Sequence, residues 1–351
     1  MARADHDRRP PARPGAARRD RRERFRPRRR ARDRPGVTCA VLGTGVMGSD
    51  IALSLALGGE EVRVWGRRAA GLEESRARAR RNAAFLVVEG LERDESALER
   101  ITWTTERARA LEDVVFACEA VSEELALKHE LLGSAEEELG AGAVLVSTTS
   151  ALSPTRLAEP LTRPERFVVT HYAQPAHLVA LVEVVPGERT SPETVAEASS
   201  LLERTGKRPA VCADMPGFLW SRLQQAVLRE LVHLVARGDV TPETCDTVVK
   251  YGYASRLPAM GPFEHADLAG LELMGNQARE IWPDLATAQG PDDGPIGELR
   301  ARGWTGMAAG RGFYDWRVRD PDAFRLERDR EIVRRLKITR GGEVVLKGPE
   351  A

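Results

Sequence analysis

Short apolar runs alternate with stretches of helical spacing along the chain up to residue 214. The runs have the length of strands and are rich in Val, Ile and Leu, which is typical of strands buried on both faces of a parallel sheet. Strands that alternate with helices predict βαβ units and therefore an α/β fold. The predicted strands span 37–42, 62–65, 101–104, 113–121, 143–147, 167–171, 181–185 and 209–214.

The pattern changes after Asp214, where the strand signals stop. Residues 218–237 carry apolar side chains at helical spacing, on a face wide enough to predict a deeply buried helix. Gly238 ends this helix, and Thr241 with the Pro and Glu that follow predicts the start of another. We therefore predict an all-helical second domain over 215–320, followed by a helical or irregular extension over 321–351.

Three glycines follow the first predicted strand in G-x-G-x-x-G spacing: Gly43, Gly45 and Gly48. The first permits a tight turn, the second lets the backbone approach a pyrophosphate, and the third lets the next helix close on the strand. The free N–H groups at the start of that helix, around Val46 and Met47, would face the phosphates. Residues 37–214 are therefore predicted to form a Rossmann-type domain that binds NAD(P).

The end of the second strand bears on the choice between NAD and NADP. An acidic residue at this point normally binds the ribose 2′-hydroxyl of NAD. This chain has Gly66 there, followed by Arg67 and Arg68. The loss of a carboxylate and the gain of two cations suit a 2′-phosphate, so NADP is predicted to be preferred, with NAD as the alternative.

The net charge of zero conceals an uneven distribution. Residues 1–36 carry 15 arginines and five acidic residues, whereas the rest of the chain has 38 basic and 48 acidic residues. The Arg-rich start has too few apolar residues to fold, which predicts a disordered tail without function. A basic arm that binds nucleic acid is the alternative for this tail. The acidic remainder argues against a nucleic-acid partner.

The chain has no apolar run near the ~20 residues that are needed to span a bilayer, so no membrane partner is predicted. Its four cysteines are scattered and form no C-x-x-C pair, which predicts buried free thiols and a cytoplasmic location. No metal site is predicted. The cysteines are Cys39, Cys118, Cys212 and Cys245.

Polar residues end several predicted strands at the edge of the sheet where α/β proteins bind ligands, among them Glu119, Ser150 and His171. Glu183 interrupts an apolar strand, and a buried carboxylate needs a partner. A histidine suits proton transfer because its pKa lies near neutral pH, and a neighbouring carboxylate stabilises the imidazolium. We therefore predict a dyad of His171 and Glu183. Histidines without such a context are interpreted as structural: His177, His233 and His265.

Seven segments that occur in order along residues 37–316 resemble the 3-hydroxyacyl-CoA dehydrogenase family, in its monofunctional form. They are GTGVMG, CEAVSEELALKHELL, STTSALS, THYAQPAHLVALVEVVPGE, DMPGFLWSRL, GPFEHADLAGL and GRGFYDW. The resemblance implies a Rossmann-type domain and a helical C-terminal domain that forms a homodimer. It also implies hydride transfer between a nicotinamide cofactor and C3 of a 3-hydroxyacyl thioester.

The resemblance implies roles for individual residues. His171 matches the family histidine that moves the proton, and Glu183 matches its partner. Ser150 matches the serine that binds the substrate hydroxyl or ketone. Glu119 and Lys128 match positions on the cofactor side of the site.

The chain departs from the family pattern on the substrate side. Gln174 and Ser221 stand where the family has Asn, and Thr148 replaces the Asn of an Asn-Thr-Ser-Ser run. Because polar contacts discriminate strongly between substrates, these changes favour retained redox chemistry on an altered substrate. Two other hypotheses stay open. One is a dehydrogenase of a free 3-hydroxy acid, similar to gulonate or carnitine dehydrogenases; the other is a non-catalytic cofactor-binding protein.

Overall fold

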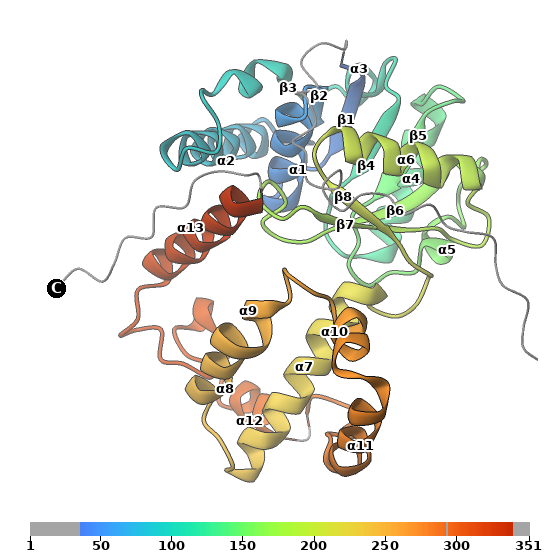
Figure 1. Cartoon of the computed structure of the whole chain (residues 1–351). Helices are drawn as coiled ribbons and strands as arrows, with labels where there is room; N and C mark the ends of the chain where they lie inside the picture. The colour runs from blue at the N-terminus through green and yellow to red at the C-terminus, as the bar shows by residue number, and fades with distance from the viewer. Residues whose placement is uncertain (1–35, 293, 340–351) are drawn as a thin grey trace, which may run out of the picture.

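The computed structural model describes residues 36–339 apart from residue 293, so the predicted tail lies outside the described residues except for Gly36. Eight strands of this part form one sheet in the order β3-β2-β1-β4-β5-β6-β7-β8 (Figure 1). Neighbouring strands run parallel except for β6 and β7, which are antiparallel. The strands are β1 (Thr38–Leu42), β2 (Glu61–Trp65), β3 (Ile101–Thr104), β4 (Phe116–Glu119), β5 (Val144–Ser147), β6 (Phe167–Tyr172), β7 (Leu181–Val185) and β8 (Arg208–Val211).

Helices cover the sheet, and the described part of the chain after β8 contains helices and no further strand of the sheet. No helix among the described residues is both long and apolar enough to cross a membrane. The α-helices are α1 (Val46–Leu57), α2 (Ala69–Val88), α3 (Arg107–Leu111), α4 (Leu125–Glu138), α5 (Pro154–Leu157), α6 (Pro192–Arg204), α7 (Phe218–Arg237), α8 (Pro242–Val248), α9 (Ala254–Arg256), α10 (Pro262–Ala269), α11 (Leu271–Ile281), α12 (Pro295–Ala301) and α13 (Pro321–Thr339). Shorter helical turns are η3 (Ser96–Arg100), η4 (Pro164–Arg166), η5 (Val249–Tyr253), η6 (Trp282–Asp284) and η7 (Met307–Ala309).

The two faces of the sheet carry separate hydrophobic cores because side chains alternate along each strand. In β1, Cys39 and Val41 pack with helices α1, α2 and α6. Ala40 and Leu42 face the other way and pack with α3, α4 and α5. Helices on both faces of a largely parallel sheet, followed by a helical segment, confirm the predicted fold class.

Two predicted strands are shorter than their apolar runs. The run at 113–121 becomes a strand only over Phe116–Glu119, because Asp113 has φ 52° and this left-handed backbone cannot continue a ladder. The last strand is Arg208–Val211. After Val211 the chain leaves the sheet and turns into α7.

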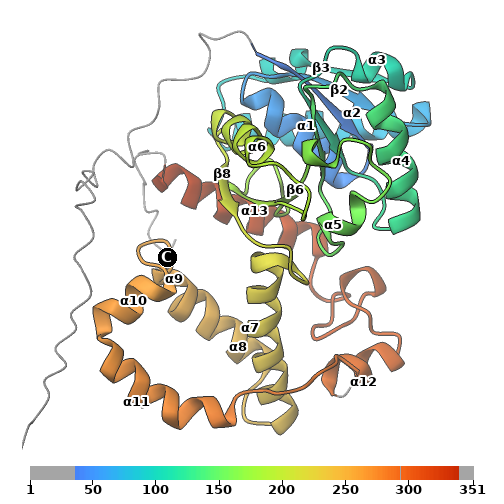
Figure 2. The ribbon, with the colours of Figure 1, turned by 90° about the vertical axis from the view of Figure 1, so that its right-hand side faces the viewer.

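The prediction that α7 is deeply buried is wrong. Phe218 is its one buried residue, while Leu219 is 47% exposed and Leu223 is 56% exposed. The C-terminal helices lie beneath the sheet domain and spread away from α7 (Figure 2). They therefore cover only part of the apolar face of α7. The sequence period predicts an apolar face but does not say what covers it.

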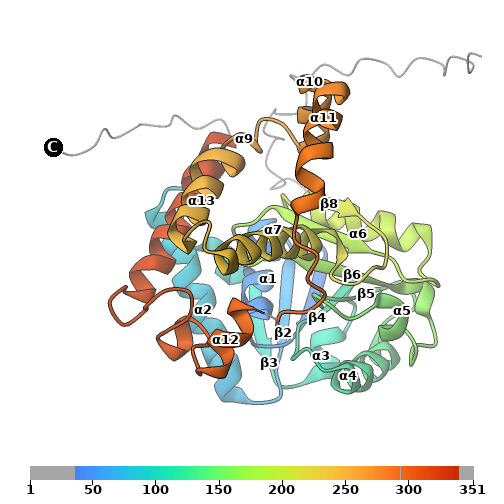
Figure 3. The same ribbon diagram turned by 90° about the horizontal axis from the view of Figure 1, so that it is seen from below.

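Helix α13 leaves the helical segment and returns to the sheet domain. Val333 is 1% exposed and belongs to a hydrophobic cluster with Leu53 of α1 and Leu86 of α2. Arg330 forms an ion pair with Glu89 at 2.8 Å. Figure 3 shows α13 lying alongside the sheet domain at the side of α2. The last described helix therefore packs on the sheet domain.

Candidate active site

The antiparallel pairing of β6 and β7 sets His171 directly opposite Glu183. Directly opposite residues of an antiparallel pair project from the same face, so their side chains meet. Nδ1 of His171 lies 2.7 Å from Oε2 of Glu183, and the two residues are 5% and 2% exposed. The structure thus brings together the two residues of the predicted dyad.

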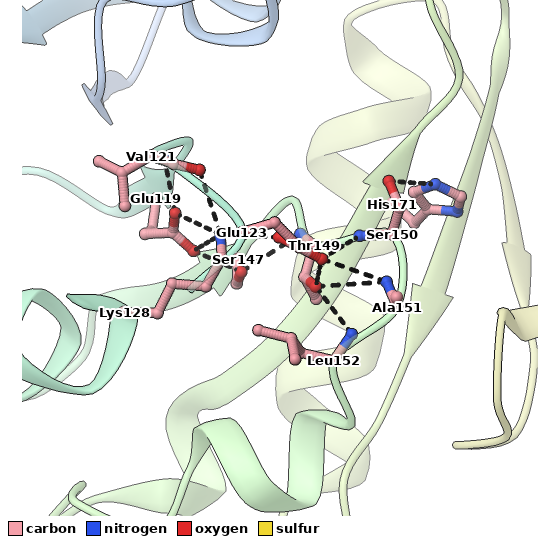
Figure 4. A network of polar contacts seen from close by, with 10 residues as sticks. All are labelled: Glu119, Val121, Glu123, Lys128, Ser147, Thr149, Ser150, Ala151, Leu152 and His171. Carbon is pink, nitrogen blue, oxygen red and sulfur yellow. Dashed lines mark hydrogen bonds and ion pairs between the residues drawn. The ribbon is translucent and has the colours of Figure 1, made fainter. Parts of the chain in front are cut away.

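The second ring nitrogen of His171 faces Ser150. Its Nε2 lies 3.1 Å from the Ser150 Oγ, at the end of the turn that follows β5 (Figure 4). A carboxylate can only accept, so Nδ1–H donates to Glu183 and the Nε2 of a neutral ring accepts from the serine hydroxyl. Ser150 is exposed, whereas the Phe218 ring lies 5.6 Å from the imidazole centroid. The imidazole therefore lies between a buried aromatic ring and an exposed serine.

The other oxygen of Glu183 receives the start of α7. Oε1 accepts from the backbone N–H groups of Leu219 at 2.9 Å and Trp220 at 2.8 Å. Phe218 has φ 48°, uncommon for a non-glycine residue, at the turn into this helix. The hydrogen bonds offset the cost of burying the carboxylate, and the helix terminus favours its negative charge.

A thiol also borders this carboxylate. The Cys212 Sγ lies 3.7 Å from the Glu183 Oε1 and donates to it. Burial first, and then the charge of Glu183, raises the pKa of the Cys212 thiol to about 11. At neutral pH the thiol is therefore protonated, and it adds no second negative charge to the dyad.

A second buried carboxylate, Glu119, ends β4. Its Oε1 accepts from the Lys128 Nζ and from the backbone N–H of Val121, both at 2.7 Å, and its Oε2 accepts from the Ser147 hydroxyl. Glu119 is 0% exposed and Lys128 is 1% exposed. The structure joins these two residues to each other. Their contact with a cofactor stays a prediction.

Glu123 belongs to the same network, and the sequence argument missed it. Its carboxylate accepts from the hydroxyl of Thr149, from the backbone N–H of Ser150 at 3.0 Å and from that of Ala151 at 3.3 Å (Figure 4). Burial alone would raise the pKa of Glu123, but the Thr149 hydrogen bond and the charge of Lys128 outweigh it and lower that pKa. The carboxylate holds the turn that presents Ser150 to the imidazole.

The glycine turn after β1 has the shape that a dinucleotide requires. A Cβ on Gly43 would lie 2.2 Å from the Ala120 carbonyl oxygen, and a Cβ on Gly48 would lie 2.2 Å from the Gly43 oxygen. Gly45 has no neighbour within 4 Å of such an atom, so its backbone borders open space. No side chain caps the N-terminus of α1, and Val46 is 38% exposed. These features fit a bound pyrophosphate.

The end of β2 explains the missing acidic residue. A Cβ on Gly66 would lie 2.4 Å from the Cγ2 of Thr44, so a side chain there would collide with the glycine turn. Arg67 and Arg68 are exposed and lead into α2. The position therefore offers positive charge and no carboxylate.

The two remaining predicted substrate residues lie on the loop after β6 and in α7, and their contact with a substrate stays a prediction. Gln174 is exposed, two residues after the end of β6, and Ser221 is half-buried in the first turn of α7. A dinucleotide turn and a carboxylate-oriented histidine at the same edge of a sheet define a class of protein, the nicotinamide-dependent dehydrogenases.

Comparisons with known proteins identify the family. Residues 38–215 match the 3-hydroxyacyl-CoA dehydrogenase NAD binding domain, and residues 217–316 match the C-terminal domain of the same family. The chain therefore belongs to the 3-hydroxyacyl-CoA dehydrogenase family, which confirms the predicted family and an NAD(P)-dependent oxidoreductase.

Three curated relatives match this chain over nearly the whole of their own length. The chain is 29% identical to 5-formyl-3-hydroxy-2-methylpyridine 4-carboxylate 5-dehydrogenase of Mesorhizobium japonicum, over 87% of this chain and 98% of the relative. It is 33% identical to L-carnitine dehydrogenase of Streptomyces coelicolor, over 86% and 94%. It is 30% identical to a probable 3-hydroxybutyryl-CoA dehydrogenase of Bacillus subtilis, over 79% and 96%.

Solved structures give a graded likeness. The crystal structure of the 5-formyl-3-hydroxy-2-methylpyridine 4-carboxylic acid 5-dehydrogenase, described as an NAD+-dependent dismutase, superposes with a TM-score of 0.82. It is 29% identical, over 88% of this chain and all of that one. The (S)-3-hydroxybutyryl-CoA dehydrogenase of Ralstonia eutropha gives a TM-score of 0.63 at 26% identity, over 80% and 98%.

Proposed function

We propose that this protein transfers a hydride between NAD(P) and the hydroxyl-bearing carbon of a hydroxy acid, with His171 as the general base and acid. The observation that carries the proposal is the relay from Glu183 through His171 to Ser150, with contacts of 2.7 and 3.1 Å. One end of this relay is buried and charged, and Ser150 at the other end is exposed. A proton can therefore enter or leave at one defined atom, the Nε2 of His171.

Each residue of the relay has a separate task. The bound nicotinamide supplies or accepts the hydride. In the oxidation direction, Nε2 of His171 takes the proton of the substrate hydroxyl, and Glu183 stabilises the imidazolium that forms. Ser150 donates a hydrogen bond to the substrate oxygen from the position where it now contacts the imidazole. In the reduction direction the same nitrogen returns the proton.

The substrate we favour is a free acid and not an acyl thioester. The support is the graded likeness: a TM-score of 0.82 to a dehydrogenase of a pyridine carboxylate, against 0.63 to a 3-hydroxybutyryl-CoA dehydrogenase. The carnitine dehydrogenase among the relatives points the same way. Gln174 and Ser221 are the residues that we assign to the substrate side. The acyl thioester remains the second candidate, because the family and a 30% identical relative include it.

For the cofactor we propose a preference for NADP, with the glycine turn and the start of α1 holding the pyrophosphate. Two exposed arginines after β2 support a 2′-phosphate, and Thr44 leaves no room for an acidic side chain at Gly66. Arg67 and Arg68 would each contribute a charge-assisted contact. We further propose that Glu119 and Lys128 shape the cofactor side of the site by fixing the end of β4.

The experiment follows NAD(P)H absorbance with free 3-keto acids and with acetoacetyl-CoA, each tested with both cofactors. We expect turnover on a free acid, and faster turnover with NADPH than with NADH. Replacing Arg67 and Arg68 with Ala should raise KM for NADPH and leave KM for NADH within about twofold, because only the 2′-phosphate contact is lost. Faster turnover of acetoacetyl-CoA, or a large advantage of NADH, would overturn the corresponding assignment.

We also propose a homodimer that forms through the helical domain, in the cytoplasm. Phe263 of α10 is 88% exposed, Leu268 is 75% exposed and Trp282 is 72% exposed, and apolar surface of this extent favours association. All four cysteines are free, as in a reducing compartment. Light scattering should give twice the chain mass, and Phe263→Glu should lower it. Val88→Glu, at a residue of the sheet domain that is 77% exposed, is the control and should not.

A further inference from the structure

The loop that joins β6 to β7 connects the two residues of the dyad. It runs from Ala173 to Ala180, between His171 and Glu183, and it carries Gln174 on its exposed side. Its other side is buried, since Ala176 is 0% exposed and the His177 side chain is 5% exposed. The attachments of the buried side therefore set where Gln174 stands.

One attachment is a carboxylate of the dinucleotide helix. Asp50 lies on α1 two residues after Gly48, is 3% exposed, and accepts from the Asn82 Nδ2 at 2.8 Å through Oδ1. Its Oδ2 lies 3.3 Å from the Nδ1 of His177. The angle is too poor for a hydrogen bond, and Nδ1 has no other hydrogen-bond partner among the described residues. The contact is therefore one of charge and dipole, between two buried side chains.

The remaining attachments hold the backbone of the loop. The Lys207 Nζ donates to the carbonyl oxygen of Ala176 and, at 2.9 Å, to that of Val179. The N–H groups of Leu178 and Val179 both donate to the Pro175 carbonyl, at 3.0 and 2.9 Å. Lys207 fixes the main chain, and Leu178 packs in a hydrophobic cluster with Leu53 of α1. The contact of His177 with Asp50 is the polar side-chain link from this loop to α1.

We propose that Asp50 and His177 are positioning residues that hold the loop between β6 and β7 to helix α1. This inference rests on the proposed function, in which the start of α1 receives the pyrophosphate and Gln174 faces the substrate. Asn82 satisfies one oxygen of the buried Asp50 carboxylate, and the other oxygen faces His177, so Asp50 favours the buried position of the His177 side chain. The loop is then fixed relative to the glycine turn, so Gln174 is already in position before the substrate binds.

The kinetic test uses Asp50→Asn and His177→Ala, singly and together. Asp50→Asn keeps the volume and the oxygen that accepts from Asn82 but removes the charge. Each single change should raise KM for the substrate about tenfold, with kcat within about threefold, because residues in one contact couple by amounts of this size. The double variant should be no worse than either single one. His177→Gln, which keeps a polar group beside Asp50, should recover most of the loss.

A matched control is Glu60→Gln. Glu60 is also a buried carboxylate of the dinucleotide domain, at 3% exposure, but its partners are Arg204 and the Val37 backbone N–H. This variant should lose thermal stability without a change in KM. An equal rise of KM in the control would mean that general destabilisation, and not the loop anchor, sets substrate affinity, and this result would overturn the proposal.

A second readout is independent of turnover. Hydrogen exchange at the Leu178 and Val179 amides should accelerate at least tenfold in Asp50→Asn and stay unchanged in Glu60→Gln, because only the first releases the loop. If no compound of the substrate panel reacts with the wild-type enzyme, the proposed function fails and exchange alone decides on the anchor. If the Leu178 and Val179 amides of Asp50→Asn exchange at the wild-type rate, the proposal is overturned, whether or not a substrate is found.

Discussion

Two buried carboxylates of the sheet, Glu183 and Glu119, have similar surroundings and different partners. Each is almost fully buried, and each accepts hydrogen bonds from at least one backbone N–H group and from one basic side chain. The partner of Glu119 is Lys128, which is itself 1% exposed. The partner of Glu183 is His171, whose ring has two nitrogens.

The difference lies in what the partner can reach. The Lys128 ammonium is enclosed by acceptors, including Glu123 at 3.3 Å, so its proton has no path to a substrate. His171 uses one nitrogen for Glu183 and leaves the other facing the exposed Ser150. A closed pair can only stabilise the fold. A pair with one nitrogen free for a further partner can perform chemistry. Substitutions in either pair test this difference.

The largest effect is expected at the open pair. His171→Ala should lower kcat by about 10²- to 10⁴-fold, which is the usual contribution of a general acid–base group. Glu183→Gln should come close to this loss, because an amide can donate to Nδ1 and so favour the wrong tautomer of the imidazole. Cofactor affinity, measured by NAD(P)H fluorescence, should change little. Wild-type turnover in His171→Ala would remove this residue from the mechanism.

A smaller effect on activity and a larger one on stability are expected at the closed pair. Glu119→Gln leaves Lys128 buried without its main countercharge, and breaking a buried pair costs about 3–5 kcal/mol. Chemical denaturation should show this loss, while kcat of the folded fraction should stay within about tenfold of wild type.

The control for the closed pair is the double variant. Glu119→Gln together with Lys128→Met removes both charges, so it should be more stable than Glu119→Gln alone. Strictly additive losses would show that the two side chains do not act as a pair. A loss of kcat in Glu119→Gln as large as in His171→Ala would erase the distinction between the two carboxylates.

Much of the fold and the dyad could be predicted because single residues broke strong patterns. The glycine spacing after β1 predicted the dinucleotide turn, and Glu183 stood out as a carboxylate within an apolar strand. The family resemblance matched Glu183 to the partner of His171, and the register of β6 and β7 brings the two residues together. In each case the physical constraint is local: a backbone that needs glycine, or a charge that cannot be buried alone.

Other features could not be predicted because their determinants are distant in sequence. Glu123 stands near the start of α4, where an acidic residue usually faces solvent, and its role depends on a turn 26 residues away. His177 and Asp50 are 127 positions apart and break no local pattern. The exposure of α7 depends on what packs against it, which periodicity does not encode.

The smallest effect is expected from pH, because the Cys212 thiol donates to Glu183 and gains a negative charge beside that carboxylate when it ionises. The folded pKa of Cys212 is raised to about 11 from an ordinary 9.0. The folded state then keeps a proton that the unfolded chain releases between these values, so this stabilisation is present below pH 9 and is lost as pH rises toward 11. Burial also raises the pKa of Cys39, Cys118 and Tyr172, so the whole domain should lose stability at alkaline pH.

The contribution of Cys212 can be isolated by substitution. Between pH 8 and 10.5 the Tm of Cys212→Ala should fall by about 1–3 °C less than that of the wild type, a small shift because the thiol is partly exposed. Differential scanning calorimetry at low ionic strength measures both curves. Cys245→Ala is the comparison variant: burial raises the pKa of this thiol as well, but it lies in the helical domain at α8, away from both carboxylates. Parallel curves for wild type and Cys212→Ala would mean that neither burial nor the charge of Glu183 raises the pKa of the Cys212 thiol in the folded state.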